Sequence, residues 1–296
     1  MKTIIKYIGI AIFVLSVFSC SKNDDINIEQ EQINYRVTSF YTDSGTYDIS
    51  YNQNSLIETI QMPNGSTNAV DYNSRNKITS IGSAIYQYND ANNIISIITE
   101  NTEATVTYNA QGKIALITTA KVNTDNSVSH STASFIYNAN GMVGEIIENN
   151  TNAPTLTYRN RFTYDANLNM TQVLEEETTD NINFILTRTR TITYDNKKSP
   201  YYATNNVLNE YSNISVYDLW NFYSSQLTRK SFQDVWHYSP NNYLTINKVT
   251  STGATTYFNF ENTYNSDDFV TLMDRTVTSP TGVETYAVYG FNYETY

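Results

Sequence analysis

The chain has 296 residues, 26 of them tyrosine, and a formal net charge of −11 at pH 7. An acidic surface repels phosphate backbones, so nucleic acid is not expected as a partner. The single cysteine excludes an internal disulfide and a cysteine-based zinc site. Abundant Tyr and Thr favour strands and abundant Asn favours turns, so the composition predicts strands joined by tight turns.

Residues 1–19 have the layout of a secretion signal. Lys2 and Lys6 give a positive start, and an uncharged apolar run from Ile8 to Phe18 follows. That run is shorter than the roughly 20 residues that a permanent membrane-spanning helix needs. The small Ser19 stands directly before the only cysteine, Cys20. A plain signal peptide followed by a chance cysteine is the alternative interpretation.

The run Val17-Phe18-Ser19-Cys20 resembles the lipobox of bacterial lipoproteins, although Phe18 is bulkier than the usual residue there. This resemblance implies that Cys20 carries the lipid. The next residues, Ser21-Lys22-Asn23-Asp24-Asp25, resemble the lysine-plus-acidic tract of surface-exposed lipoproteins of Bacteroidetes. They imply a lipid-anchored protein on the outer membrane, facing the cell exterior. Residues 20–34 are then a polar tether, and the lipid anchor is the only expected membrane contact.

A motif recurs in the remaining residues, 35–296. It consists of Tyr, then Asn or Asp, then turn-forming residues, and an apolar residue six places after the Tyr, as from Tyr108 to Ile114. Each copy predicts one β-hairpin, in which the Tyr ends a strand and the apolar residue begins the next. Copies start at Tyr51, Tyr72, Tyr88, Tyr108, Tyr137, Tyr164, Tyr238 and Tyr264, with a degenerate copy at Tyr194.

The turn chemistry predicts backbone angles. In a type I turn closed by a bulge, the residue four places after the Tyr needs positive φ, which Gly, Asn and Asp tolerate. The residues expected there are Asn76, Asn92, Gly112, Gly141, Asn242 and Asp268. Ser55, Leu168 and Lys198 depart from this rule, so their turns are expected to be shifted or longer.

The motif resembles the YD repeat of Rhs-type proteins, with Asn mostly in place of Asp and with irregular spacing. Together with the lipoprotein start, the chain is similar to a Bacteroidetes lipoprotein family of unknown function with a porin-like fold. The resemblance covers roughly residues 36–296 and implies no established activity. We therefore expect an all-β fold, a single domain over residues 35–296, of antiparallel hairpin repeats wound into a barrel-like or curved open sheet.

One stretch, about residues 200–231, lacks the repeat and is expected to be a short helix or a loop crossing the sheet. It is rich in aromatic residues, and flat aromatic faces can stack on sugar rings. The candidate ligand-binding residues here and just beyond are Trp220, Trp236, Tyr217, Tyr223 and Tyr238. Packing in the core is the competing interpretation of these side chains.

A membrane-embedded barrel is the alternative to a barrel or sheet that stands in water. Its last strand should carry apolar residues at alternate positions back from Tyr296. Those positions hold Glu294, Asn292 and Gly290, which are polar or small, and strands such as residues 189–193 lack an apolar lipid face. The sequence therefore favours the water-exposed form.

The sequence shows no catalytic set, cofactor motif or metal site. His130 and His237 lie in unlike settings, and no Gly-x-Ser-x-Gly elbow is present. Asp165-Ala166-Asn167-Leu168-Asn169 has the oxygen spacing of a calcium loop, but the repeat turn explains the same residues. The run from Glu175 to Glu177 alternates faces and is expected to face solvent or to repel edge pairing.

Three functions stay open at this point. The first is a non-catalytic surface module that binds a glycan or an envelope protein, marked by an exposed row of aromatics. The second is a structural scaffold without a pocket, and the third is a glycoside hydrolase-like enzyme with two acids facing each other across a cleft.

Overall fold

The computed structural model describes residues 35–42, 45–150, 155–200 and 239–296. Residues 34–296 form one compact unit. The signal, Cys20 and the tether, and the expected insertion beyond Pro200, lie outside the described residues. In the described part of the chain, no helix is long and apolar enough to cross a membrane.

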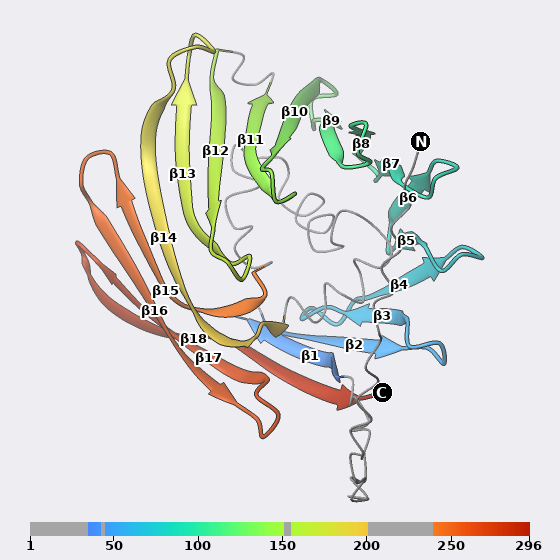
Figure 1. The fold of residues 1–296 in the computed structure, drawn as a ribbon. Helices are drawn as coiled ribbons and strands as arrows, with labels where there is room; N and C mark the ends of the chain where they lie inside the picture. The colour runs from blue at the N-terminus through green and yellow to red at the C-terminus, as the bar shows by residue number, and fades with distance from the viewer. Residues whose placement is uncertain (1–34, 43–44, 151–154, 201–238) are drawn as a thin grey trace, which may run out of the picture. The chain divides into compact units, whose positions relative to one another are not determined.

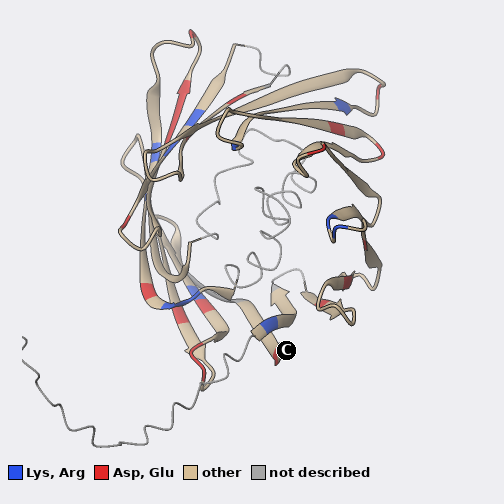
Figure 2. Ribbon diagram, turned by 45° about the vertical axis from the view of Figure 1, so that its right-hand side comes forward, with Lys and Arg blue, Asp and Glu red and all other residues tan. Residues whose placement is uncertain are grey.

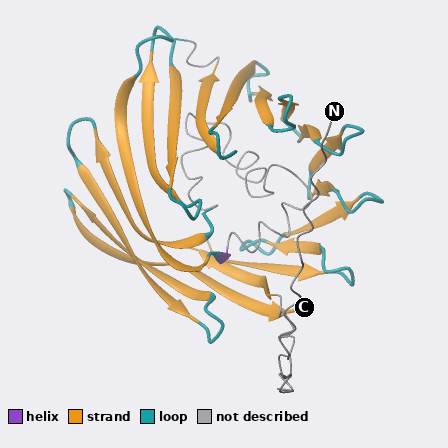
Figure 3. Cartoon of the chain, viewed as in Figure 1, coloured by secondary structure: helices purple, strands orange, loops and turns teal. Residues whose placement is uncertain are grey.

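The described residues form eighteen strands, and every strand pairs antiparallel with the next (Figures 1 and 3). The last strand also pairs with the first, with Val37 opposite Tyr293, so the sheet closes into a barrel. The strands are β1 Tyr35–Thr42, β2 Gly45–Tyr51, β3 Ile57–Gln61, β4 Thr67–Tyr72, β5 Ile78–Ile81, β6 Ala84–Tyr88, β7 Ile94–Ile98, β8 Thr102–Tyr108, β9 Ile114–Val122, β10 Val128–Tyr137, β11 Val143–Asn150, β12 Thr157–Tyr164, β13 Met170–Thr178, β14 Ile185–Lys198, β15 Asn241–Thr250, β16 Thr255–Tyr264, β17 Val270–Ser279 and β18 Gly282–Thr295. The expected all-β antiparallel fold is confirmed in its closed form.

The repeat turns have the expected geometry. In the copy at Tyr108, the Asn109 amide donates to the Lys113 carbonyl at 2.8 Å, and the Gly112 amide donates to the Asn109 carbonyl at 3.0 Å. The Asn109 side-chain oxygen accepts from the amides of Gln111 and Lys113. The strand register shifts by one residue beside Tyr108, as a bulge requires. Tyr108 therefore ends β8 and Ile114 begins β9.

Five of the six residues expected at positive φ adopt it: Asn76, Asn92, Gly112, Gly141 and Asp268, with φ between 57° and 86°. The prediction for Asn242 is wrong, because this residue lies within the extended β15 and its amide donates to Asp195. Leu244 consequently does not begin a strand. The chain between β14 and β15 makes no repeat turn in the described residues.

The prediction that the turns at Ser55 and Leu168 are shifted or longer is also wrong. These two residues have φ of 61° and 67°, so both turns keep the normal length despite an unfavourable residue. The Asp165 side chain explains this for Leu168, because its Oδ1 accepts from the amides of Asn167 and Asn169 and holds the turn closed. The same carboxylate is thereby committed to the turn, which accounts for the calcium-like spacing. No group of metal-ligand side chains occurs among the described residues.

One face of the wall is buried and apolar. In β8, Ala104 and Val106 are buried, whereas Glu103, Thr105 and Thr107 between them are exposed. We assign the buried face to the barrel interior, because nothing among the described residues packs over the outside. Acidic and basic residues lie scattered around the wall (Figure 2). The core beside the hairpin turns runs around the barrel through Ile49, Val70, Tyr86, Val106, Phe162, Ile192, Phe260 and Phe291.

Leu168 offers a test of the turn strain. A leucine side chain in the left-handed region costs about 1 kcal/mol, and Leu168 is 42% exposed and contributes little packing. We expect Leu168→Asn to raise the free energy of unfolding by roughly 0.5–1 kcal/mol, because Asn tolerates this conformation. Leu168→Val, with its branched Cβ, is expected to lower that free energy. Chemical denaturation measures both, and equal effects of the two substitutions would contradict the assignment.

Candidate functional site

The repeat tyrosines gather at one end of the barrel. The turns that follow β2, β4, β6, β8, β10, β12 and β16 lie at this end, as do the end of β14, the start of β15, the start of β1 and the end of β18. We call this end the tyrosine rim, formed by Tyr51, Tyr72, Tyr88, Tyr108, Tyr137, Tyr164, Tyr194, Tyr264 and Tyr293. Eight of these side chains are partly buried against the core, and Tyr137 is half-buried.

Eight of the nine rim tyrosines extend a strand ladder beyond its last backbone pair, by donating to a carbonyl that has no backbone donor opposite it. Pairing between β7 and β8 stops at Ser96 and Thr105, two residues before Ile94. The Tyr108 hydroxyl donates to the Ile94 carbonyl at 2.7 Å and so extends the ladder to the rim. Ile94 itself pairs with Tyr88, the preceding rim tyrosine. The bond therefore links one hairpin turn to the next.

The same arrangement repeats around the rim. Eight hydroxyls donate to carbonyls at 2.6–2.8 Å: Tyr51 to Val37, Tyr72 to Ile57, Tyr88 to Ile78, Tyr108 to Ile94, Tyr137 to Ile114, Tyr164 to Val143, Tyr194 to Met170 and Tyr293 to Val270. Because Val37 pairs with Tyr293, the series closes on itself where β1 meets β18. Burial raises the pKa of Tyr108 and Tyr137 to about 12, so these hydroxyls stay protonated donors.

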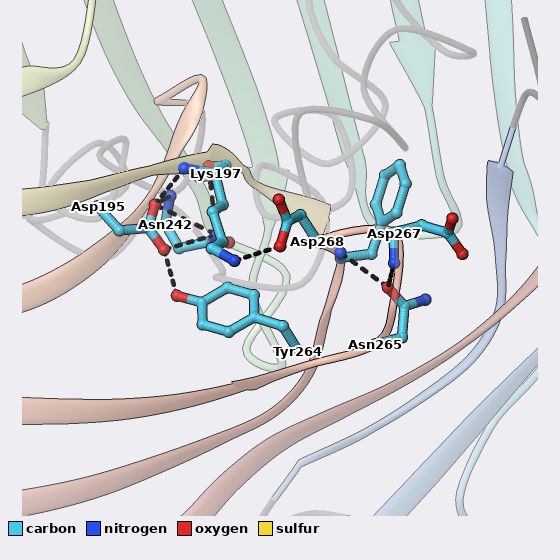
Figure 4. Close-up of polar contacts among 8 residues, drawn as sticks. Asp195, Lys197, Asn242, Tyr264, Asn265, Asp267 and Asp268 are labelled. Atoms are coloured by element: carbon cyan, nitrogen blue, oxygen red, sulfur yellow. Dashed lines mark hydrogen bonds and ion pairs between the residues drawn. The ribbon is translucent and has the colours of Figure 1, made fainter.

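Tyr264 is the exception in this series. The equivalent acceptor would be the carbonyl of Tyr243, which pairs with Tyr194, but the Asn262 side-chain amide donates to it at 3.3 Å. The Tyr264 hydroxyl donates instead to the Asp195 carboxylate (Figure 4). The ladder thus changes its chemistry at the place where β14 and β15 are joined by residues 199–240 rather than by a repeat turn.

Asp195 collects donors from three segments. Its carboxylate accepts from the Lys197 amide at 2.9 Å, the Asn242 amide at 3.1 Å and the Asn242 side chain at 3.0 Å (Figure 4). Lys197 pairs with Asp268, and its ammonium lies 4.3 Å from the centre of the Tyr264 ring. We call Asp195, Lys197, Asn242, Tyr264 and Asp268 the seam.

The seam continues into the neighbouring turn. The Asn169 side chain donates to the Asn241 side chain at 2.9 Å, and the Asn241 amide donates back to Asn169 at 3.0 Å. The Ser239 hydroxyl donates to the Tyr194 hydroxyl at 2.9 Å. Asn169, Asn242 and Ser239 are at most 3% exposed. The network therefore fixes both ends of residues 199–240 to the wall without a tight turn.

Long basic side chains join neighbouring rim turns. The Arg75 guanidinium donates to the Asn92 side chain at 2.8 Å, and the Lys113 ammonium donates to the Gly141 carbonyl at 2.6 Å. Lys197, near the end of β14, makes a similar link to Asp268 in the turn after β16. All three acceptors are on the positive-φ residue of the following turn. The turns are therefore held to one another as well as to the strands.

A cavity of about 410 Å³ opens between the turns that follow Tyr72 and Tyr88. We call it the rim groove; its lining is Asn73, Ser74, Arg75, Tyr88, Asn89, Asp90 and Asn92. The lining combines amides, a hydroxyl, a carboxylate, a guanidinium and one aromatic ring. Such a set can donate and accept several hydrogen bonds at once.

The wall also carries buried charge on both faces, away from the rim. Glu175 pairs with Arg188 at 2.9 Å and with Arg190 at 2.6 Å, and Glu176 pairs with Arg159 at 2.6 Å on the other face. Both glutamates are about as buried as core residues, so the expectation of solvent-facing acids is wrong. The arginines on flanking strands explain the burial, because they neutralise the carboxylates.

Glu148 differs from those paired acids. It is 8% exposed, and the Asn160 side-chain amide donates a hydrogen bond to it at 3.5 Å. Burial raises the pKa of this carboxyl to about 7. A weakly solvated carboxyl is stable there because it can take up a proton.

The aromatic candidates from the sequence lie outside the described residues. This applies to Trp220, Trp236, Tyr217, Tyr223 and Tyr238, and also to His237. Their assignment to a ligand site stays a prediction, as does lipid attachment at Cys20. His130 is described; it is exposed on β10, opposite Ala120 of β9. The sequence reasoning did not identify the rim groove or the seam, because both join turns from different repeats.

Known proteins resemble this chain in fold at low identity. No family model and no curated protein matches it. A porin-like protein from Bacteroides uniformis is 13% identical over 87% of this chain and 96% of its own length, with a TM-score of 0.47. A porin-like protein from Bacteroides vulgatus is 12% identical over 88% of this chain and 99% of its own, with a TM-score of 0.44. Function is therefore argued from the site.

Removing one ladder bond should weaken the barrel measurably. We expect Tyr108→Phe to lower the free energy of unfolding by about 1 kcal/mol, because the Ile94 carbonyl loses its donor while the ring stays. Tyr47→Phe is the matched control, since the Tyr47 ring stacks on Phe40 at 4.7 Å and its hydroxyl has no hydrogen bond among the described residues. Denaturant unfolding compares the two, and equal losses would contradict the ladder.

The seam predicts unequal roles for two aspartates. Asp195→Ala is expected to lower the free energy of unfolding by about 2–3 kcal/mol, because Tyr264 and the buried Asn242 side chain lose their acceptor. Asp268→Asn keeps a residue that tolerates positive φ and removes only an exposed ion pair, whose contribution is about 0–1 kcal/mol. Thermal or denaturant unfolding of both variants provides the measurement. A larger loss for Asp268→Asn would overturn this account of the seam.

Proposed function

We propose that the chain is a non-catalytic surface module of the cell envelope that binds a glycan or a protein partner. The observation that carries this proposal is the tyrosine rim itself. Eight hydroxyl bonds, two turn-to-turn links and the ion pair from Lys197 to Asp268 hold a ring of polar turns in place. Affinity improves when binding groups are ordered before the ligand arrives, and such a ring of turns meets that condition.

The inward acids support a binding role over hydrolysis. A glycoside hydrolase needs one carboxyl that donates a proton and a second that attacks or activates water. Glu148, with its raised pKa, suits the first role. Glu175 is the acid of the neighbouring inward row, and two arginines already neutralise it. A carboxylate paired with two arginines is a poor nucleophile. We therefore propose that Glu148 and Glu175 have a structural role in the barrel wall and no catalytic role.

We also propose that Cys20 anchors the barrel to the outer membrane and that the barrel stands in water. The exposed face of the strands supports the second part, because residues such as Glu103, Thr105 and Thr107 do not suit lipid. The chain enters the barrel at the tyrosine rim. There the ring centres of Tyr35 and Phe269 lie 4.7 Å apart. A tether of residues 20–34 spans at most about 50 Å, which keeps the rim within reach of the anchoring surface.

A glycan array probed with the chain from Ser21 to Tyr296 tests the binding role. We expect retention on a restricted class of glycans. If no glycan on the array binds and a pull-down from cell envelopes recovers a stoichiometric protein partner, the ligand is that protein. If neither experiment detects a ligand, the scaffold function replaces the binding function.

Cell fractionation of the full chain accompanies the array. The unaltered chain should fractionate with outer membranes, and Cys20→Ala should be lost from that fraction because it carries no lipid. Outer-membrane association that persists in carbonate after Cys20→Ala would contradict the anchor and favour an embedded barrel.

A further inference from the structure

The rim groove has the volume of a small binding site and is open to solvent. Its volume of about 410 Å³ falls within the range of ligand pockets. It lies between two consecutive turns of the repeat, and the Arg75 guanidinium spans them by donating to Asn92 at 2.8 Å. One turn contributes Asn73, Ser74 and Arg75, and the other contributes Asn89, Asp90 and Asn92.

The amides of the groove are held by their own turns. The Asn73 side-chain oxygen accepts from the amides of Arg75 at 2.9 Å and Lys77 at 3.0 Å, and that of Asn89 accepts from Asn93 at 3.0 Å. Each oxygen is therefore occupied, and each side-chain NH₂ group has no hydrogen bond among the described residues. Two donors are thus oriented by the fold and available to a ligand.

The remaining lining supplies acceptors and an apolar wall. The Asp90 carboxylate is exposed and has no hydrogen bond or ion pair among the described residues. Tyr88 is fixed because its hydroxyl donates to the Ile78 carbonyl at 2.6 Å, so its ring lines the groove in one position. Neighbouring hydroxyls of a sugar can donate to a carboxylate and accept from amides, while an aliphatic ring face can contact an aromatic one.

The charge of the groove selects among polar ligands. Arg75 and Asp90 bring one positive and one negative charge, and the other lining residues are neutral. A phosphate would meet the Asp90 carboxylate, and a cation would meet the Arg75 guanidinium. A neutral ligand rich in hydroxyls avoids both conflicts. We propose that the rim groove is a subsite for one neutral sugar ring, a proposal that rests on the glycan form of the proposed function.

The repeat supplies variants that leave the turns intact. The position of Asp90, two places after the repeat tyrosine, holds Ala110, Ala139 and Ala166 in other copies, and the position of Arg75 holds Ala91 in the next. Asp90→Ala and Arg75→Ala therefore keep side chains that the same turn already accepts. Gln53→Ala, at the position equivalent to Asp90 in another turn, is the matched control.

Calorimetry and ligand-observed NMR on the chain from Ser21 to Tyr296 test the subsite. The probes are glucose, galactose, mannose, N-acetylglucosamine and xylose, with glucose 6-phosphate as the charged comparison. We expect at least one neutral sugar to bind, and Asp90→Ala and Arg75→Ala to weaken it by about tenfold or more, because each removes a charged hydrogen-bonding group. Gln53→Ala should leave the affinity unchanged.

The outcomes separate the two proposals. Sugar binding that is unaffected by Asp90→Ala and Arg75→Ala would overturn the groove and leave the glycan-binding function standing. Tighter binding of glucose 6-phosphate than of glucose would overturn the neutral ligand class. An unaltered chain that binds neither the probes nor the array would remove the glycan function itself. Far-ultraviolet circular dichroism of each variant confirms that the barrel is retained.

Discussion

The bond from a rim tyrosine hydroxyl to the carbonyl two residues beyond the end of a strand ladder is the interaction on which this barrel depends. Strands that splay apart at a turn leave a buried carbonyl without a backbone donor, which is costly in an apolar setting. A tyrosine can reach that carbonyl while its ring covers the core. One residue type thus satisfies the hydrogen bond, fills the gap between hairpins and fixes their spacing, as Tyr108 does for Ile94.

Closure adds a different interaction. Each hydroxyl reaches the residue that pairs with the preceding tyrosine, so the bonds run in one direction around the rim. The bonds at the two ends of the series join β2 to β1 and β18 to β17, and none of the eight crosses from β18 to β1. Backbone pairing closes that junction, with Val37 opposite Tyr293. The closed barrel therefore satisfies backbone donors and acceptors of β1 and β18 that a curved open sheet would leave at its edges.

The seam shows what is needed when one repeat turn is replaced by a long connection. The carbonyl of Tyr243 takes an amide donor, and Tyr264 turns to the Asp195 carboxylate. Asn169, Asn241, Asn242 and Ser239 then supply bonds that a tight turn would have made within itself. Elsewhere the regular turns stand side by side and leave polar spaces between them, such as the rim groove.

The sequence by itself determined the local geometry of this protein. Turn positions, the bulge and the positive φ at residues such as Gly112 and Asn92 depend on a few neighbouring side chains, so a motif of seven residues predicts them. The alternation of Ala104 and Val106 with polar residues likewise predicts a strand with one buried face. The all-β class and the hairpin repeat followed from these local rules.

Only the tertiary structure decided the rest, because it depends on contacts between repeats. The carbonyl that each tyrosine reaches lies 10 to 24 residues away, as for Tyr88 and Tyr194, and spacing in the sequence does not specify it. Glu175 is buried because arginines on the next strand face it. The rim groove arises only when two turns stand side by side in the closed barrel. Residue types set each hairpin, whereas the pairing of all eighteen strands set where the hairpins meet.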